Sequence, residues 1–265
     1  MTARPIGVFD SGLGGLTVLR ALIDLLPDEP VVYFGDTGRF PYGPKPGDEV
    51  LKYALEIGDV LADRDAKLLV VACNSAASVA LHTLRARHDV PVIGVIEPGM
   101  RAAIAASRSG RVGVIGTVGT IASGAYQDAA DASGGDVTLT CTACPGFVEF
   151  VEAGDVDSDQ VHVLAERMLA PVRDAGVDTL VLGCTHYPML ARTISDVMGR
   201  DVVLVSSADE TAFEVRDLLV TGTVGAASAG AGGHTFLTSG DVDTFRRLGE
   251  RFLGPEVASV ERWEW

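Results

Sequence analysis

The sequence predicts an α/β protein of two pseudo-symmetric lobes, each a mostly parallel sheet flanked by helices, with the active site in the cleft between them. Two observations lead to this prediction. Short apolar runs alternate with helical patterns along the whole chain, which is typical of parallel sheets with helices on both faces. In addition, Cys73 and Cys184 each directly follow such a run, at matching places in the two halves of the chain.

The strands are expected where short apolar runs are bounded by glycine, proline or small polar residues. In chain order they are residues 6–9, 31–35, 68–72, 92–94, 112–115, 137–140, 179–182 and 202–204, with a final short pair at 235–237 and 257–260. Apolar residues spaced by three and four predict one helix through residues 161–172 and a second, looser one through 51–61. Residues 222–233 are rich in glycine and alanine and predict a surface loop.

The two halves of the chain repeat the same elements. A strand that ends in a small polar loop occurs at Asp10 and again at Thr117, each a similar distance before one of the two cysteines. Glu97-Pro98-Gly99 interrupts the pattern and marks a boundary, and we expect the chain to cross back near residues 206–209. The first lobe is therefore expected to contain residues 1–97 plus 209–265, and the second residues 98–208.

Charge and hydropathy narrow the possible partners. A formal net charge of −15 opposes binding to nucleic acid and to anionic membrane surfaces. The apolar runs are far shorter than the ~20 residues that a membrane-spanning helix needs. The first strand is expected to begin by Ile6, without a signal-peptide pattern before it. We therefore expect a cytoplasmic protein whose cysteines are free thiols.

The sequence does not favour a cofactor or a metal. Pyridoxal phosphate requires a Schiff-base lysine, and the chain has only Lys45, Lys52 and Lys67, of which the last two are expected at the surface. Cys141-x-x-Cys144 is at most half of a zinc or redox site, because no second pair and no suitably spaced histidine accompany it. We therefore expect neither a cofactor nor a metal.

The two matching cysteines predict proton-transfer chemistry. A residue just past the carboxyl end of a parallel strand faces the ligand crevice, so Cys73 and Cys184 are expected to face one site. Two acid/base groups on opposite sides of one carbon are what a cofactor-independent racemase needs. Helix N-termini are expected to lower the thiol pKa values, with His186 and Asp10 as proton relays for Cys184 and Cys73 respectively.

The motifs also resemble a known family. Five blocks are similar, in content and order, to the signature blocks of bacterial glutamate racemases of the aspartate/glutamate racemase family: Asp10-Ser11-Gly12-Leu13-Gly14-Gly15, Pro41-Tyr42-Gly43, Ala72-Cys73-Asn74-Ser75-Ala76, Gly116-Thr117 and Gly183-Cys184-Thr185-His186-Tyr187-Pro188. The resemblance implies a cofactor-independent amino-acid racemase (an isomerase) that interconverts L- and D-glutamate and supplies peptidoglycan synthesis. It also implies a homodimer.

The resemblance further implies a role for each site residue. Cys73 would face the hydrogen of the D-isomer and Cys184 that of the L-isomer, with Asp10, His186 and Glu152 as supporting acids and bases. The residues implied to bind the substrate are Asp10, Ser11, Tyr42, Gly43, Asn74, Ser75, Thr117, Thr185 and His186. Ser75 stands where the family usually has threonine, which keeps the hydroxyl and removes a methyl group.

Two alternatives remain open on the sequence. The chain is either a related racemase that acts on aspartate or a hydantoin, or a non-catalytic protein that binds a small anion. The first differs in its preferred substrate, and the second would bind glutamate without exchanging its α-hydrogen.

Overall fold

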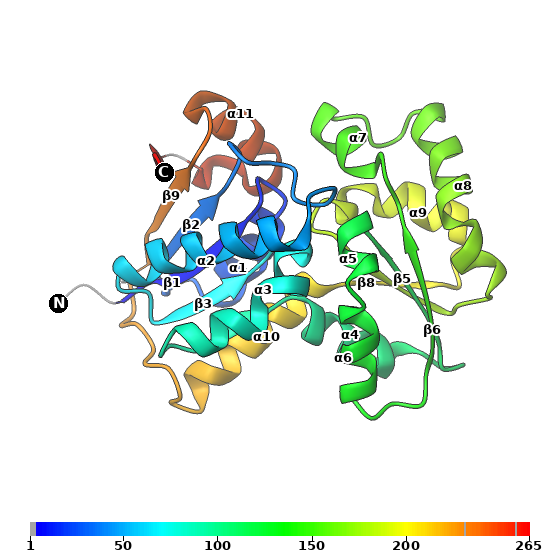
Figure 1. Ribbon diagram of the computed structural model, residues 1–265, viewed down its shortest axis with the longest axis horizontal. Coiled ribbons are helices and arrows are strands. Elements are labelled where there is room, and N and C mark those ends of the chain that lie inside the picture. Colours follow the sequence, from blue (N-terminus) through cyan, green and yellow to red (C-terminus); the bar gives the residue numbers. More distant parts are fainter. Residues whose placement is uncertain (1–3, 231, 258) are drawn as a thin grey trace.

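The computed structural model describes residues 4–230, 232–257 and 259–265 and shows two lobes side by side (Figure 1). The first lobe contains a six-stranded sheet and the second a four-stranded sheet, and every neighbouring pair of strands in both is parallel. The predicted α/β fold with two parallel sheets is thus confirmed.

The first sheet has the strand order β10-β9-β2-β1-β3-β4. Its strands are β1 (Ile6–Asp10), β2 (Val31–Gly35), β3 (Leu68–Val71), β4 (Val92–Gly94), β9 (His234–Thr238) and β10 (Val260–Arg262). The helices next to these strands in the chain are α1 (Leu16–Leu25), α2 (Gly47–Asp63), α3 (Asn74–Arg87), α10 (Ser207–Val220) and α11 (Val242–Leu253), and a short 3-10 turn, η2 (Gly254–Glu256), follows α11.

The second sheet has the strand order β6-β5-β7-β8. Its strands are β5 (Arg111–Gly116), β6 (Thr138–Ala143), β7 (Thr179–Gly183) and β8 (Val203–Ser206). The helices are α4 (Ile96–Ala106), α5 (Val118–Ala122), α6 (Ala125–Ala132), α7 (Phe147–Ala153), α8 (Asp159–Asp174) and α9 (Ala191–Met198), which follows the 3-10 turn η1 (Tyr187–Leu190).

The repeat predicted from the sequence is visible in the topology. The order β2-β1-β3-β4 in the first sheet matches β6-β5-β7-β8 in the second, element for element. Cys73 therefore follows the third strand of one unit, and Cys184 follows the third strand of the other. Equivalent strand ends deliver the two thiols from the two lobes.

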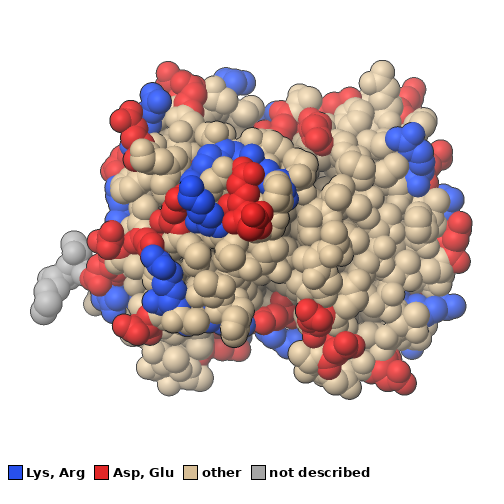
Figure 2. Space-filling model, in the orientation of Figure 1, with Lys and Arg blue, Asp and Glu red and all other residues tan. Residues whose placement is uncertain are grey.

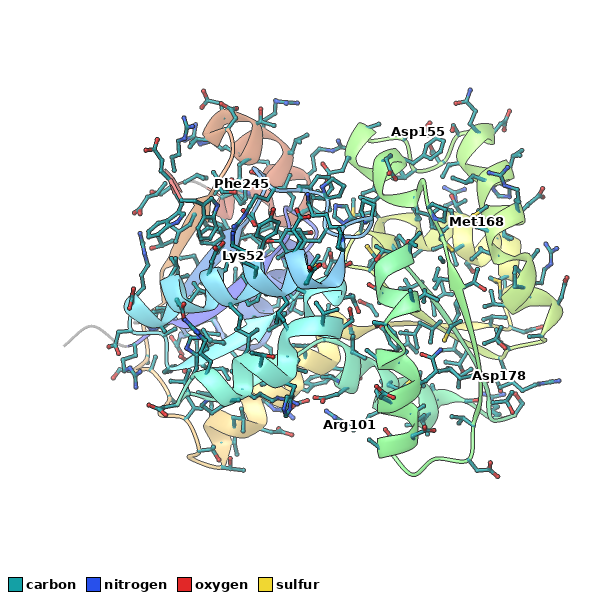
Figure 3. All side chains as sticks on the ribbon, in the orientation of Figure 1. Lys52, Arg101, Asp155, Met168, Asp178 and Phe245 are labelled. Atoms are coloured by element: carbon teal, nitrogen blue, oxygen red, sulfur yellow. The ribbon has the colours of Figure 1, made fainter. Side chains whose placement is uncertain are left out.

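The strands form because their residues are apolar on both faces and are covered by helices on both sides. All residues of β1, β2, β3 and β7 are buried, as continuous apolar runs in parallel sheets usually are. Helices pack on both sheets (Figure 3). In the first lobe, Phe245 of α11 packs near Tyr33 of β2, with ring centroids 6.3 Å apart. In the second lobe, α8 contains Met168.

The two expected helices are present, with one difference in detail. In α8 the predicted stripe is buried at Val161, Ala165, Leu169 and Val172. In α2 the expected stripe was Leu51, Ala54, Leu55, Gly58 and Leu61, and Ala54, Gly58 and Leu61 are buried as predicted. Leu51 and Leu55 are only partly buried, and Val50, Ile57 and Val60 complete the buried face.

Three other expectations need correction. The last strand begins at Val260 rather than at residue 257; Val257 is buried near α11, and residue 258 lies outside the described residues. Glu97, Pro98 and Gly99 do not interrupt the structure, because they form the first turn of α4, where a proline is tolerated.

The third correction concerns Lys67, which is buried rather than exposed. Its Nζ donates to Glu29 Oε2 at 2.5 Å and to the carbonyl of Gly225 at 2.6 Å. Residues 222–230 contain no helix or strand and form a loop, as expected. This loop supplies backbone partners to the ion pair, and Ala227 N–H donates to Glu29 at 2.8 Å. A pattern of charges along the chain could not reveal that a distant glycine-rich loop covers this lysine.

None of the helices in the described part of the chain combines the length and apolar content needed to cross a membrane. Charged side chains are spread over the outer parts of both lobes, whereas uncharged surface prevails on the face in view where the lobes meet (Figure 2).

Candidate active site

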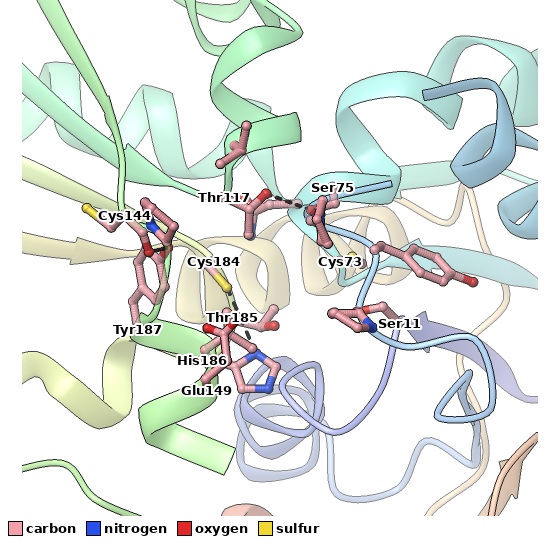
Figure 4. A pocket seen from close by; sticks show the side chains of 18 of the residues that line it. Ser11, Cys73, Ser75, Thr117, Cys144, Glu149, Cys184, Thr185, His186 and Tyr187 are labelled. Atoms are coloured by element: carbon pink, nitrogen blue, oxygen red, sulfur yellow. Dashed lines mark hydrogen bonds between the residues drawn. The ribbon is translucent and has the colours of Figure 1, made fainter. Parts of the chain in front are cut away.

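A cavity between the two lobes brings most of the predicted site residues together. It holds about 650 Å³ of empty space, its open mouth included. The close-up in Figure 4 shows Cys73 and Cys184 reaching this space from different sides. The sequence-predicted residues among its lining are Ser11, Tyr42, Gly43, Cys73, Asn74, Ser75, Thr117, Cys184, Thr185 and His186. Asp10 and Glu152 are not among its lining: Asp10 is completely buried, and Glu152 lines a second cavity with Gly12 and Phe40.

The local backbone explains how each thiol reaches the cavity. Cys73 is the N-cap residue of α3 and directly precedes its first turn, whereas Cys184 lies between β7 and the short turn η1. Both side chains are almost fully buried, at 5% and 7% exposure, and both are free thiols. An α-helix therefore begins directly after Cys73, whereas only a 3-10 turn follows Cys184.

The environment of Cys73 raises the thiol pKa rather than lowering it. Burial is the main cause, and the nearby Asp10 carboxylate adds to it, so that the pKa of Cys73 is about 12. The N–H groups of Ala76 and Ser11 act in the opposite direction but are outweighed. The expected lowering of the thiol pKa by the helix N-terminus is therefore wrong for Cys73, because desolvation and a neighbouring negative charge dominate there.

Asp10 is completely buried at the end of β1 and supports the loop that follows it. One carboxylate oxygen accepts from Gly12 N–H at 3.0 Å, and the other accepts from the Thr185 hydroxyl at 3.5 Å. A Cβ atom at Gly15 would lie 2.5 Å from the Cβ of Asp10, so only glycine allows this approach. Asp10 thus joins the first lobe to the loop that contains Cys184.

His186 connects Cys184 to Glu152. Its Nδ1 lies 3.9 Å from the Cys184 sulfur, and its Nε2 lies 2.7 Å from Glu152 Oε1. Burial lowers the pKa of this imidazole, but the hydrogen bonds to Cys184 and Glu152 raise it more, to about 10. His186 is therefore protonated near neutral pH and donates from both nitrogens.

Aromatic rings and a glycine enclose His186. The rings of Phe40 and Phe252 each lie 6.0 Å from the imidazole, centroid to centroid, and exclude water from it. A Cβ atom at Gly14 would lie 2.6 Å from His186 Nδ1. The Asp10–Gly15 block thus packs closely against the second lobe, and glycine at position 14 makes this approach possible.

Hydroxyl and amide groups form the wall of the cavity opposite His186. The hydroxyls of Ser75 and Thr117 lie 2.9 Å apart, and both contact the buried hydroxyl of Thr120. Asn74 accepts a hydrogen bond from Tyr126 at 2.8 Å, whereas its Nδ2 is buried without a partner among the described residues. An unpaired buried donor beside a cavity is suited to a ligand oxygen.

Tyr42 is present at the cavity but its hydroxyl points elsewhere. It donates to the fully buried Asp36, which also accepts from Arg39 at 2.7 Å. Burial and the Asp36 charge raise the pKa of Tyr42, so that it remains a neutral donor. Of the Tyr42-Gly43 pair, the backbone is therefore the part free to contact a ligand.

The cavity wall contains no lysine or arginine among the residues that the structure describes. The carboxylate among the described lining residues is that of Glu149. A small anion in the cavity would therefore be held by neutral donors and by His186. Across the described ranges, no group of three or more His, Cys, Asp or Glu side chains is arranged to hold a metal ion.

Several lining residues were not identified from the sequence. They are Phe40, Pro41, Pro44, Val118, Cys144, Pro145, Gly146, Val148, Glu149 and Tyr187. Tyr187 donates to the carbonyl of Cys144 at 3.1 Å and holds the 144–149 segment against the cavity. Tyr187 lies in the motif that contains Cys184, and this proximity in the sequence could have indicated it as a cavity residue. Residues 144–149 reach the cavity only through tertiary packing, so no sequence pattern indicated them.

The comparisons with known proteins agree with this geometry. The family model described as Asp/Glu/Hydantoin racemase matches residues 6–214. A glutamate racemase of Acidothermus cellulolyticus is 55% identical over 98% of this chain and 99% of its own length. The crystal structure of a glutamate racemase isoform from Bacillus anthracis is similar with a TM-score of 0.94 and 41% identity, covering 100% of this chain and 98% of that one. A Francisella tularensis glutamate racemase solved in complex with D-glutamate has a TM-score of 0.93 and 32% identity, over 100% and 98% of the two chains.

Proposed function

The chain belongs to the Asp/Glu/hydantoin racemase family, and from this premise we propose that it interconverts L- and D-glutamate without a cofactor, using Cys73 and Cys184 as its two acid/base groups. One observation supports the mechanism most directly: both thiols line a single cavity, and they come from equivalent strand ends of the two lobes. High identity to glutamate racemases supports glutamate rather than aspartate or a hydantoin as the substrate.

The reaction needs one proton to leave the α-carbon as another arrives. From L-glutamate, the Cys184 thiolate takes the α-proton, and the Cys73 thiol gives its proton to the opposite face of the carbon. The pKa of about 12 at Cys73 favours the protonated thiol, which is the form required for this direction. From D-glutamate the two thiols exchange roles, and no net proton is consumed in either direction.

Supporting residues return protons to their starting places. His186 contacts Cys184 through Nδ1, and its other nitrogen pairs with Glu152, so a positive charge beside the sulfur is stabilised from both sides. Asp10 lies near Cys73 and is the corresponding group on the other side. These assignments make His186, Glu152 and Asp10 relays rather than the groups that touch the α-carbon.

Neutral donors are proposed to hold the two carboxylates of the substrate. Asn74 Nδ2 lacks a partner among the described residues, and the hydroxyls of Ser11, Ser75, Thr117 and Thr185 belong to residues of the cavity wall. The backbone of Gly43 completes the set. Ser75 and Thr117 are hydrogen-bonded to each other, Asn74 to Tyr126 and Thr185 to Asp10. Donors held in this way require little reorganisation when negative charge develops on the substrate.

We propose that the lobes are residues 1–97 plus 209–265 and residues 98–208. The six-stranded sheet uses strands only from the first set, and the four-stranded sheet only from the second. The chain passes between the sheets after β4 and again after β8. In the cell we propose a cytoplasmic homodimer that supplies D-glutamate to peptidoglycan synthesis and does not bind nucleic acid or membranes directly; family resemblance and the negative net charge support this.

The test is racemisation in D2O with no added cofactor. L-Glutamate is expected to lose its optical rotation while deuterium enters the α-position, because the thiol protons exchange with solvent. Cys73→Ala and Cys184→Ala should each abolish the reaction, and neither should rescue a bacterium that requires D-glutamate, whereas the wild-type chain should. Cys141→Ala, which removes a partly exposed thiol outside the cavity lining, is the matched control. Normal racemisation by either Cys73→Ala or Cys184→Ala, or faster turnover of aspartate than of glutamate, would contradict the proposal.

A further inference from the structure

Tyr126 of α6 contacts the cavity wall from the other lobe. Its side chain is 1% exposed, and its hydroxyl donates to Asn74 Oδ1 at 2.8 Å. Asn74 begins α3 in the first lobe, so this hydrogen bond crosses between the lobes. Burial raises the pKa of Tyr126, and the hydroxyl therefore remains a neutral donor.

The remaining half of the Asn74 amide is free to bind a ligand. Asn74 is 3% exposed and lines the cavity, and its Nδ2 has no partner among the described residues. A side-chain amide has one accepting end and one donating end. With Oδ1 held by Tyr126, the donating end is the one left for an acceptor in the cavity.

The tyrosine hydroxyl selects between the two orientations of this amide. If the amide were reversed, Nδ2 would donate to the tyrosine oxygen and Oδ1 would be the atom left for the ligand. The tyrosine proton would then lose Asn74 Oδ1, which is its acceptor in the described structure, and would be buried unpaired. A carbonyl oxygen facing a carboxylate would also repel it. The hydrogen bond that Tyr126 donates to Asn74 Oδ1 therefore disfavours the reversed orientation of the amide.

We propose that Tyr126 is a positioning residue that holds the Asn74 amide with its NH2 group toward the substrate, where it donates to a carboxylate oxygen of glutamate. The identity of that substrate rests on the proposed function. Because the hydroxyl and the amide belong to different lobes, the orientation is set only when the lobes meet as they do here. Tyr126 thereby links lobe closure to the strength of substrate binding.

The test compares Tyr126→Phe with the wild type in steady-state racemisation. The variant keeps the buried ring and loses only the donor. KM for glutamate should rise about tenfold while kcat changes less than threefold, since the lost interaction holds ground state and transition state alike. Tyr53→Phe removes a tyrosine hydroxyl that pairs with Glu49 outside the cavity, and it should leave KM unchanged.

A double-mutant cycle separates positioning from general damage. In an Asn74→Ala background, Tyr126→Phe should change KM less than twofold, because the amide that it orients is gone. An unchanged KM in the single variant, or an equal rise in both backgrounds, would overturn the inference while leaving an active wild type and the proposed function intact. A wild-type chain that neither binds nor racemises glutamate would overturn both.

Discussion

The sulfurs of Cys73 and Cys184 occupy equivalent positions in the two lobes, yet their neighbours differ in charge. Cys73 lies near the carboxylate of Asp10, whereas Cys184 lies 3.9 Å from an imidazole that is protonated near neutral pH. A neighbouring negative charge favours the protonated thiol, and together with burial it raises the pKa of Cys73. The pseudo-symmetry of the fold therefore does not extend to the charges beside the two thiols.

The raised pKa of His186 makes part of the stability depend on pH. Its pKa is about 10 in the folded chain against about 6.5 when unfolded. A raised folded pKa stabilises fully below the unfolded value, and the contribution is lost as pH rises through the folded one. Between pH 7 and pH 10 the free energy of unfolding should fall by up to about 4 kcal/mol more in the wild type than in His186→Asn. Urea titrations at several pH values measure this, and parallel curves for the two proteins would contradict it.

Sequence patterns located residues of the site only where chemistry and local structure coincide. The place of Cys73 and Cys184 at the cavity could be predicted because each is a thiol just past a buried strand. Glu152 was indicated only by family resemblance, and its contact with His186 depends on how α7 packs. Tyr126 gave no signal, because its importance arises from a hydrogen bond to Asn74 in the other lobe. Asp36 directly follows β2, but its partners Tyr42 and Ser239 approach it only in the folded chain.

At the scale of elements, prediction was best where burial alone decides the structure. Strands β2 and β4 were predicted with their observed bounds, since an apolar run that is buried on both faces has few alternatives. β10 was predicted too early because its position is set by pairing with β9 and not by its own composition. Pro98 and Gly99 suggested an interruption of the pattern where the structure has the first turn of α4, because they were interpreted without knowing that a helix begins just before them.

The loop after β2 tests how an element positions the cavity wall. Asp36 is fully buried and accepts from Tyr42, from Arg39 and from Ser239. Asp36→Asn breaks a buried ion pair and should destabilise the protein by about 3 kcal/mol, and KM for glutamate should rise because the Tyr42 loop is loosened.

The matched control for that loop is an exposed ion pair of the same kind. Asp59 pairs with Arg87 at 2.6 Å with both side chains at least 40% exposed, and Asp59→Asn should cost less than about 1 kcal/mol. Chemical denaturation and steady-state kinetics on both variants provide the comparison. Equal losses of stability in the two would show that Asp36 does not act through its buried partners.

For the whole molecule, the cavity exists only because the two lobes touch in several places at once. The hydroxyls of Ser75 and Thr117 meet across the interface, and Gly119 N–H donates to the carbonyl of Gly43 at 2.9 Å. These contacts close the wall on the side of α5, and the Asp10–Thr185 contact joins the lobes at another point. In the proposed reaction, closure of this kind would exclude water from the carbanion-like transition state.

The contact between Gly43 and Gly119 therefore allows activity and stability to be separated. A Cβ atom at Gly119 would lie 2.9 Å from the carbonyl oxygen of Gly43, so Gly119→Ala must push the two lobes apart by a few tenths of an ångström. Alanine favours the helix by about 0.5–1 kcal/mol over glycine, so the free energy of unfolding should stay equal or rise. At the same time kcat/KM for glutamate should fall about tenfold, because small misplacements of reacting groups are costly. Gly225→Ala, where an added Cβ meets nothing within 4 Å, should change neither quantity. Retention of full kcat/KM by Gly119→Ala would mean that the closed arrangement of the lobes is not what the reaction depends on.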